Sequence, residues 1–141
     1  MRINKYLAMC GVASRRKCDE ILLQGKVKVN GKVCKEPGFD VSDSDQITVD
    51  NKPVKLVNNF VYYKLNKPKG YLTTLSDDRN RKTITDLLRG VHARVFPVGR
   101  LDYSAEGLLL VTNDGETANI FMHPRNEIFK KYIVKIEGGI T

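Results

Sequence analysis

The chain has 141 residues, of which 41% are hydrophobic, and its 24 Lys and Arg residues against 16 Asp and Glu residues give a net charge of +8. This length allows one ordinary domain or two small ones. No apolar run approaches the length of a membrane span, and the N-terminus lacks the apolar stretch of a signal peptide, so we expect a soluble cytoplasmic protein. The three cysteines, Cys10, Cys18 and Cys34, lack paired CxxC spacing and predict neither a disulfide framework nor a zinc site.

Positive charge is concentrated near the N-terminus. Residues 1–35 contain nine basic and two acidic side chains, a net charge of +7, whereas residues 36–50 contain five acids and no base. A basic surface beside an acidic loop favours a partner with a phosphate backbone, the alternative being a solvated charged face. The side chains that we predict to contact RNA in this region are Arg2, Lys5, Arg15, Arg16, Lys17 and Lys28.

The first sixty residues predict two short helices, a hairpin and a further strand. Apolar residues at helical spacing predict a helix from Ile3 to Cys10, and Ser14 is a suitable N-cap for a second helix that ends near Gln24. Asn30-Gly31 predicts the tight turn of a β-hairpin, because both residues tolerate a positive φ. The remaining expected features are hairpin strands at 27–29 and 32–34, a strand followed by a turn at 47–51, and a domain boundary at 56–59.

Residues from Phe60 onward predict a second, mixed α+β unit with a substantial sheet. Residues 83–86 resemble a capping box, and residues 108–111 are apolar enough to predict a strand that is buried on both faces. The other expected elements are strands at 61–65, 95–98 and 131–136, a turn at 66–70 before residues 71–74, a short helix through Leu88 and a helix from Glu116 to Met122.

The loop from Gly99 to Gly107 lies between two apolar strands, where a rigid scaffold can present it to a substrate. It contains the charged pair Arg100 and Asp102. Spacing alone does not separate a catalytic carboxylate from a loop salt bridge or a turn-forming aspartate.

Two further polar groups receive less weight. Asp77 and Asp78 are adjacent in a loop that continues with two arginines, and we interpret them as charges on a solvated surface. His123 and His92 are far apart in sequence, so His123 has no partner for a Ser/His/Asp arrangement or a metal cluster. We assign His123 a structural or RNA-contact role.

Three separated segments resemble the ribosomal RNA pseudouridine synthase family in order and spacing. They are Asn66-Lys67-Pro68-Lys69-Gly70, Gly99-Arg100-Leu101-Asp102 with residues 107–115, and His123-Pro124-Arg125 with Lys130-Lys131-Tyr132. The first sixty residues resemble the small S4-like RNA-binding domain that precedes the catalytic domain in this family. The resemblance implies an α+β fold, with an S4-like domain at 1–58 and a mixed α/β synthase domain with a mainly antiparallel sheet, truncated at its C-terminus, at 59–141.

The resemblance also implies the chemistry. Pseudouridine formation breaks the N1 to C1′ bond, turns the base and rejoins it through C5, which needs a carboxylate and no metal or cofactor. Asp102 matches the catalytic aspartate, either as nucleophile at C1′ or as base on the sugar. Arg100 would fill the place of the flipped uridine, and Tyr132 would pack on the target base. Lys67 and Lys69 would contact phosphate.

The implied partner is ribosomal RNA or a ribosome-assembly intermediate, without a membrane or a small-molecule cofactor. The chain departs from the family at Ala105, where relatives commonly have threonine. It is also shorter than family members, whose distal part supplies a basic residue that pairs with the catalytic aspartate. We therefore expect little or no activity from the 141 residues alone. Two alternatives remain: a non-catalytic RNA- or ribosome-binding module, and a structural protein whose basic charge only aids solubility.

Overall fold

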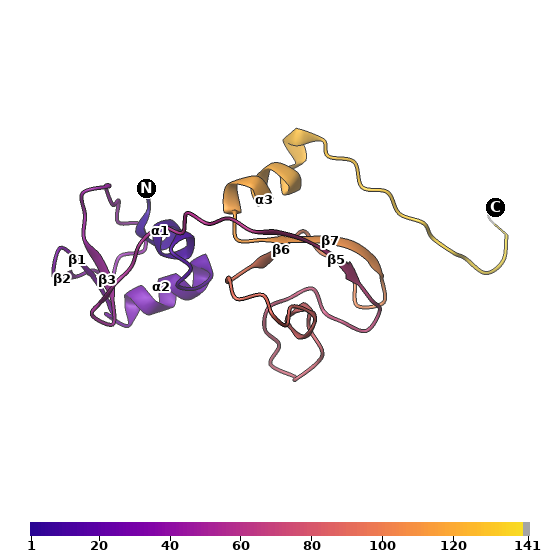
Figure 1. Ribbon diagram of the computed structural model, residues 1–141, viewed down its shortest axis with the longest axis horizontal. Helices are drawn as coiled ribbons and strands as arrows, with labels where there is room; N and C mark the ends of the chain where they lie inside the picture. The colour runs from indigo at the N-terminus through magenta and orange to yellow at the C-terminus, as the bar shows by residue number, and fades with distance from the viewer. Residues whose placement is uncertain (140–141) are drawn as a thin grey trace.

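The computed structural model describes residues 1–139, and its N-terminal part combines two helices with a small sheet (Figure 1). Helix α1 spans Ile3–Met9 and helix α2 spans Arg15–Leu23. Ser14 caps α2 as predicted, since its hydroxyl accepts a hydrogen bond from the backbone N–H of Lys17 at 3.2 Å. Both predicted helices are therefore confirmed.

The sheet of this part is antiparallel, with the strand order β2-β1-β3-β4. Asn30 and Gly31 have φ values of 51° and 81°, which confirms the predicted hairpin turn. Asp50 and Asn51 also have positive φ, so the predicted strand is followed by the predicted second tight turn. The strands are β1 at Val27–Val29, β2 at Lys32–Val33, β3 at Ile47–Val49 and β4 at Lys52–Pro53.

One apolar core joins these helices to this sheet. Side chains from both helices and from β1 are fully buried in it, and burial of one such aliphatic side chain contributes about 1.5–3 kcal/mol. The buried residues are Ile3, Leu7, Cys18, Leu22, Val27, Val29, Val41 and Ile47.

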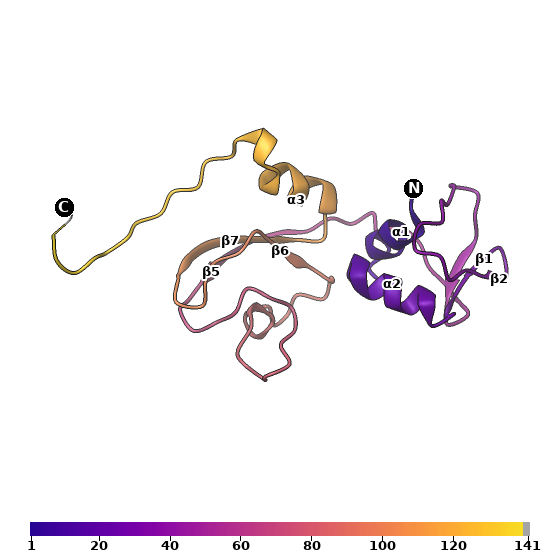
Figure 2. The same cartoon turned by 180° about the vertical axis from the view of Figure 1, so that it is seen from behind.

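The rest of the chain is built around a three-stranded antiparallel sheet with the order β5-β7-β6. Its strands are β5 at Tyr62–Lys67, β6 at Phe96–Val98 and β7 at Gly107–Thr112. Helix α3, Gly115–Met122, lies on one side of this sheet, and the segment between β5 and β6 lies on the other (Figures 1 and 2). The expected α+β class with mainly antiparallel sheets is confirmed.

Two caps place the short elements of this part. The predicted capping box is present: Asp86 accepts from the N–H of Thr83 at 3.0 Å and opens the 3-10 helix η1, Ile84–Leu87. Asp114 caps α3 by accepting from the N–H of Thr117 at 3.1 Å, and it also accepts from the Tyr62 hydroxyl at 2.6 Å. The same carboxylate thus begins α3 and fastens it to β5.

Two expectations for this part are wrong. Leu109 is buried in β7 but Leu108 is 67% exposed, so β7 is covered on only one face there. Residues 131–136 form no strand, because their alternation is not matched by a hydrogen-bonding partner, and Ile133 is 92% exposed. Of residues 71–74, Leu72 makes an isolated bridge to Thr83.

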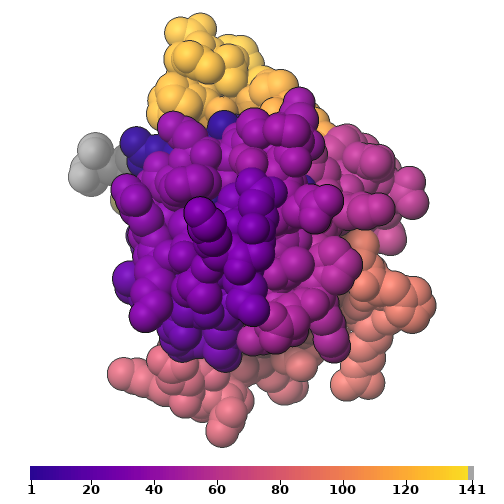
Figure 3. Space-filling model, turned by 90° about the vertical axis from the view of Figure 1, so that its left-hand side faces the viewer, coloured from indigo at the N-terminus to yellow at the C-terminus, as the bar shows by residue number. Residues whose placement is uncertain are grey.

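Seen from the side of the N-terminal part, the segment before β6 projects below that part and the region around α3 projects above it (Figure 3). Within residues 1–139, the helices are all too short or too polar to cross a membrane.

We predict that Asp114→Ala lowers the free energy of unfolding by about 1–2 kcal/mol, because α3 loses its cap. Hydrogen bonds from Thr117 and Tyr62 lower the pKa of Asp114. Its stabilisation is therefore complete above the unfolded pKa, about 3.9, and is lost as the pH falls through the folded pKa. Urea unfolding measured from pH 7 to pH 3 should show the difference between wild type and variant shrinking below about pH 4.

Tyr62→Phe is the matched control, because it removes one hydrogen bond and keeps the cap. It should destabilise the protein less than Asp114→Ala does. Equal urea midpoints for wild type and Asp114→Ala at pH 7 would show that the cap contributes nothing.

Candidate active site

The loop that carries Asp102 connects the neighbouring strands β6 and β7. It begins at Gly99, whose φ of 82° favours glycine and whose N–H donates to the sulfur of Met122 in α3 at 3.1 Å. Asp102 and Arg100 are both exposed. The sheet therefore presents the predicted charged pair to solvent.

A buried lysine holds the backbone of this loop. Lys67 is the last residue of β5, pairs with Gly107 of β7 and is 0% exposed. Its ammonium donates to the carbonyl oxygens of Asp102 at 3.0 Å, Ala105 at 2.8 Å and Pro68 at 3.1 Å. Because an ammonium has three N–H donors, this set of acceptors satisfies it completely.

Two more residues of the same segment hold the loop beside Lys67. The Thr73 hydroxyl donates to the carbonyl of Leu101 at 2.6 Å and accepts from the N–H of Leu101 at 3.1 Å. The N–H of Gly70 donates to the carbonyl of Tyr103 at 2.8 Å. We call Lys67, Gly70 and Thr73 the clamp; together they bind the carbonyls on both sides of Asp102 and that of Asp102 itself.

The clamp fixes the backbone of Asp102 without using its carboxylate. The backbone of the loop is fixed by hydrogen bonds, while the carboxylate is exposed and pairs with no base among residues 1–139. The alternative salt bridge between Arg100 and Asp102 is thus not formed. A carboxylate on a rigid support is suited to act as a nucleophile or a base, because little ordering is left to the reaction.

The contacts of Lys67 correct one prediction and explain one departure. Lys67 does not contact phosphate, because it is fully buried and saturated by carbonyls, whereas Lys69 in the same turn is exposed. Strand alternation is a signal that could have shown this, since it places Lys67 on the same face as Leu65. Ala105 needs no hydroxyl for its contact, because Lys67 binds the backbone carbonyl.

Arg100 lies in a cleft of about 790 Å³ between the two parts of the chain. Arg16 and Lys17 of α2 line one wall, and Arg94, just before β6, lines the other. In Figures 1 and 2, α2 indeed lies beside the chain that leads into β6. Sequence reasoning missed Arg94, because it belongs to no motif and only the fold brings it to the cleft.

The other predicted RNA contacts are spread over the N-terminal part. Arg2, Lys5 and Arg15 are exposed, and the guanidinium of Arg15 reaches the Asn4 side chain of α1 at 3.4 Å. Lys28 is less free, since its ammonium donates to the Asn51 side chain at 2.8 Å. The structure thus brings only Arg16 and Lys17 of the predicted set into the cleft with Arg100.

The structure does not pack Tyr132 against the Asp102 loop. Tyr132 is 64% exposed, and residues 127–139 run away from the sheet in an extended course (Figures 1 and 2). His123 has the structural role that was one of its two expected roles, because its Nδ1 accepts from the N–H of Arg125 at 3.3 Å.

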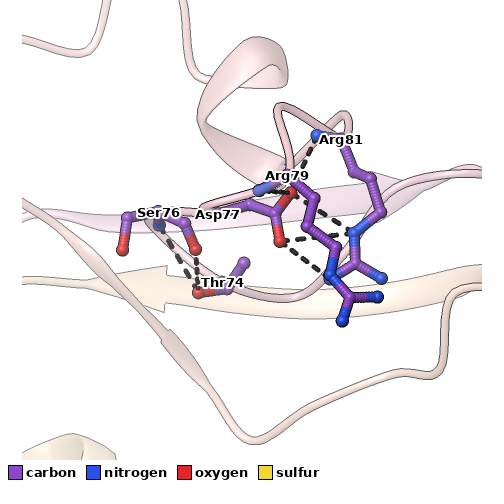
Figure 4. Close-up of polar contacts among 5 residues, drawn as sticks. All are labelled: Thr74, Ser76, Asp77, Arg79 and Arg81. Atoms are coloured by element: carbon purple, nitrogen blue, oxygen red, sulfur yellow. Dashed lines mark hydrogen bonds and ion pairs between the residues drawn. The ribbon is translucent and has the colours of Figure 1, made fainter.

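Asp77 has more contacts than a solvated surface charge. Its carboxylate accepts from the N–H groups of Arg79 at 3.2 Å and Arg81 at 2.8 Å, and from the Arg81 guanidinium at 2.8 Å (Figure 4). The Arg81 side chain is the main reason why the pKa of Asp77 falls to about 2. Asp77 therefore organises the loop that follows Thr73, and only its neighbour Asp78 is left as a solvated charge.

Comparison with known proteins gives the following similarities. Residues 61–141 match the RNA pseudouridylate synthase family, and residues 1–47 match the S4 domain. Ribosomal large subunit pseudouridine synthase B of Bacillus subtilis (strain 168) is 50% identical over 137 residues, which cover 97% of this chain and 56% of the relative. An uncharacterized RNA pseudouridine synthase of Aquifex aeolicus (strain VF5) is 50% identical over 142 residues, which cover 99% of this chain and 57% of the relative.

Among solved structures, a crystal structure of a pseudouridylate synthase matches with a TM-score of 0.49 and 26% identity, over 89% of this chain and 54% of that chain. The chain spans about half the length of the curated relatives it matches.

We predict that Lys67→Met lowers the free energy of unfolding by about 2–4 kcal/mol, because three carbonyls lose their donor in a buried place. Lys69→Met is the matched control: it makes the same chemical change two residues away on an exposed side chain and should leave stability unchanged. Urea unfolding followed by circular dichroism measures both variants. If the two variants had the same midpoint, Lys67 would not hold the loop.

Proposed function

Because the chain belongs to the RNA pseudouridylate synthase family, we propose that it isomerises uridine to pseudouridine in ribosomal RNA, with Asp102 as the catalytic carboxylate. The observation that carries this proposal is the clamped loop, which exposes the Asp102 carboxylate on a fixed backbone. We place the domain division at 58/59, with an S4-like RNA-binding domain at 1–58 and the N-terminal part of the synthase domain at 59–141.

The reaction needs little beyond this carboxylate. The N1 to C1′ bond of the uridine breaks, the base turns, and C5 bonds to C1′; C5 then loses its proton and N1 gains one, so atoms and charge balance. Asp102 acts either as the nucleophile at C1′ or as the base that takes a proton from the sugar. Arg100, two residues away and in the cleft, fills the place that the flipped uridine leaves.

Substrate and location are parts of the same proposal. The S4 domain match and the +7 charge of residues 1–35 support RNA as the partner, as free ribosomal RNA or within a ribosome-assembly intermediate. The name of the Bacillus subtilis relative describes that protein as a pseudouridine synthase of the large ribosomal subunit. We propose the cytoplasm as the location. Exposed Arg2, Lys5, Arg15 and Lys69 are proposed as further phosphate contacts.

A non-catalytic RNA-binding module is the second candidate function. It is favoured by one observation: within residues 1–139 no base pairs with the Asp102 carboxylate. In that function the S4-like part and the cleft would hold RNA without turnover. Tyr132 has the weakest support among the proposed catalytic residues, because its segment runs away from the sheet.

We predict that Asp102→Asn abolishes pseudouridine formation, with a loss of at least about a thousandfold, because the amide is neither a nucleophile nor a base. The assay uses unmodified ribosomal RNA, with pseudouridine mapped by carbodiimide treatment and primer extension. Wild type and Asp102→Asn are compared in the chain joined to the distal part of the Bacillus subtilis relative. The chain itself is assayed beside them and is expected to show little or no activity.

Glu106→Gln is the matched control, since it neutralises an exposed carboxylate in the same loop and should retain activity. Equal modification by wild type and Asp102→Asn would remove Asp102 from the mechanism. RNA binding without modification by either wild-type protein would favour the binding module.

A further inference from the structure

The cleft between α2 and the Asp102 loop holds more positive charge than the chain neutralises. Lys17 pairs with Glu20 at 2.5 Å, and Glu20 is the only acid in its lining. The guanidiniums of Arg16, Arg94 and Arg100 make no ion pair among residues 1–139. Three uncompensated guanidiniums around one cavity repel one another and are stabilised when an anion enters.

The uncharged lining of the cleft is partly apolar. Its apolar surface comes from Val12, Ala13, Leu75, Pro97 and Met122, and its hydroxyl-bearing residues are Ser14, Thr73, Thr74 and Ser76. An apolar wall beside guanidinium planes suits a base whose faces are free, because a guanidinium both stacks on bases and binds phosphate. A duplex offers its phosphates but hides the faces of its bases.

The cleft is open to solvent, with a volume of roughly 790 Å³. It adjoins Asp102 through Gly99 and Arg100, which belong both to the cleft and to the Asp102 loop. An occupant of the cleft is therefore next to the nucleotide that Asp102 would meet.

We propose that this cleft binds unpaired nucleotides that flank the target uridine, with Arg16 of the S4-like part and Arg94 of the synthase part holding the same stretch of RNA from opposite walls. The proposal rests on the proposed function for the identity of the polymer. It adds Arg94 as a binding residue. It also requires that the nucleotides beside the target uridine are unpaired for the RNA to be recognised.

The first test compares Arg94→Glu with Arg89→Glu, which makes the same change on an exposed arginine outside the cleft. The probe is a labelled RNA stem-loop with an unpaired uridine in its loop, and a fully paired duplex of equal length stands beside it. We expect Arg94→Glu to weaken stem-loop binding at least about tenfold and to reduce the salt slope by about one, with a much smaller effect on the duplex.

The second test is a double-mutant cycle on Arg16 and Arg94. If both residues hold the same nucleotides, Arg16→Glu lowers RNA affinity by a smaller factor once Arg94→Glu is present. The fold-losses in affinity caused by Arg16→Glu and Arg89→Glu should instead multiply, because these residues act independently. Unfolding midpoints equal to that of wild type show that each variant is folded, as expected for exposed arginines.

Equal effects of Arg94→Glu and Arg89→Glu, or a cycle without coupling, would overturn the proposal. Unchanged RNA affinity in Arg16→Glu and Arg94→Glu would also overturn the proposal. An acidic protein segment would then be the ligand to test in the cleft. Binding is the readout, so the outcome does not depend on turnover. Failure of the chain joined to the distal part of the Bacillus subtilis relative to form pseudouridine would refute the proposed function and leave the cleft proposal standing.

Discussion

The buried ammonium of Lys67 is the contact on which the geometry of the site depends. Removing a charge from water costs several kcal/mol unless hydrogen bonds replace the water, and here three carbonyl oxygens do so. Two of these carbonyls belong to the loop that contains Asp102. The loop therefore cannot move away without leaving a buried charge unsatisfied, and its backbone position is set by the register of β5 and β7.

This arrangement divides position, reactivity and binding among different residues. The clamp of Lys67, Gly70 and Thr73 binds only the backbone of the loop, so the contacts that fix the loop do not involve the Asp102 side chain. Charge that could bind a polyanion lies instead on Arg16 and Arg94, which reach the cleft from outside the loop. A change in the cleft can thus alter affinity while the support of the carboxylate is unaffected.

Local signals in the sequence predicted those features that depend on neighbours in the chain. The Ser14 cap and the Asn30-Gly31 turn form because the interacting groups are within three residues of each other. Lys67 and Arg94 depend on partners elsewhere: burial of Lys67 follows from a loop 35 residues away, and Arg94 meets α2 only in the fold. The segment at 131–136 shows the reverse case, where alternation without a pairing strand left an extended chain.

The net charge of +8 does not show where the unpaired positive charge lies, because that depends on which bases the acidic side chains contact. Glu20 neutralises Lys17, and Asp77 neutralises Arg81, so these bases are occupied within the protein. Asp114, by contrast, caps a helix and accepts from neutral donors, which removes no positive charge. The uncompensated charge is consequently not uniform, and part of it is gathered where the two parts of the chain meet. Since a polyanion is attracted most strongly to such a cleft, the side chains that we propose to bind RNA would also direct it toward Asp102.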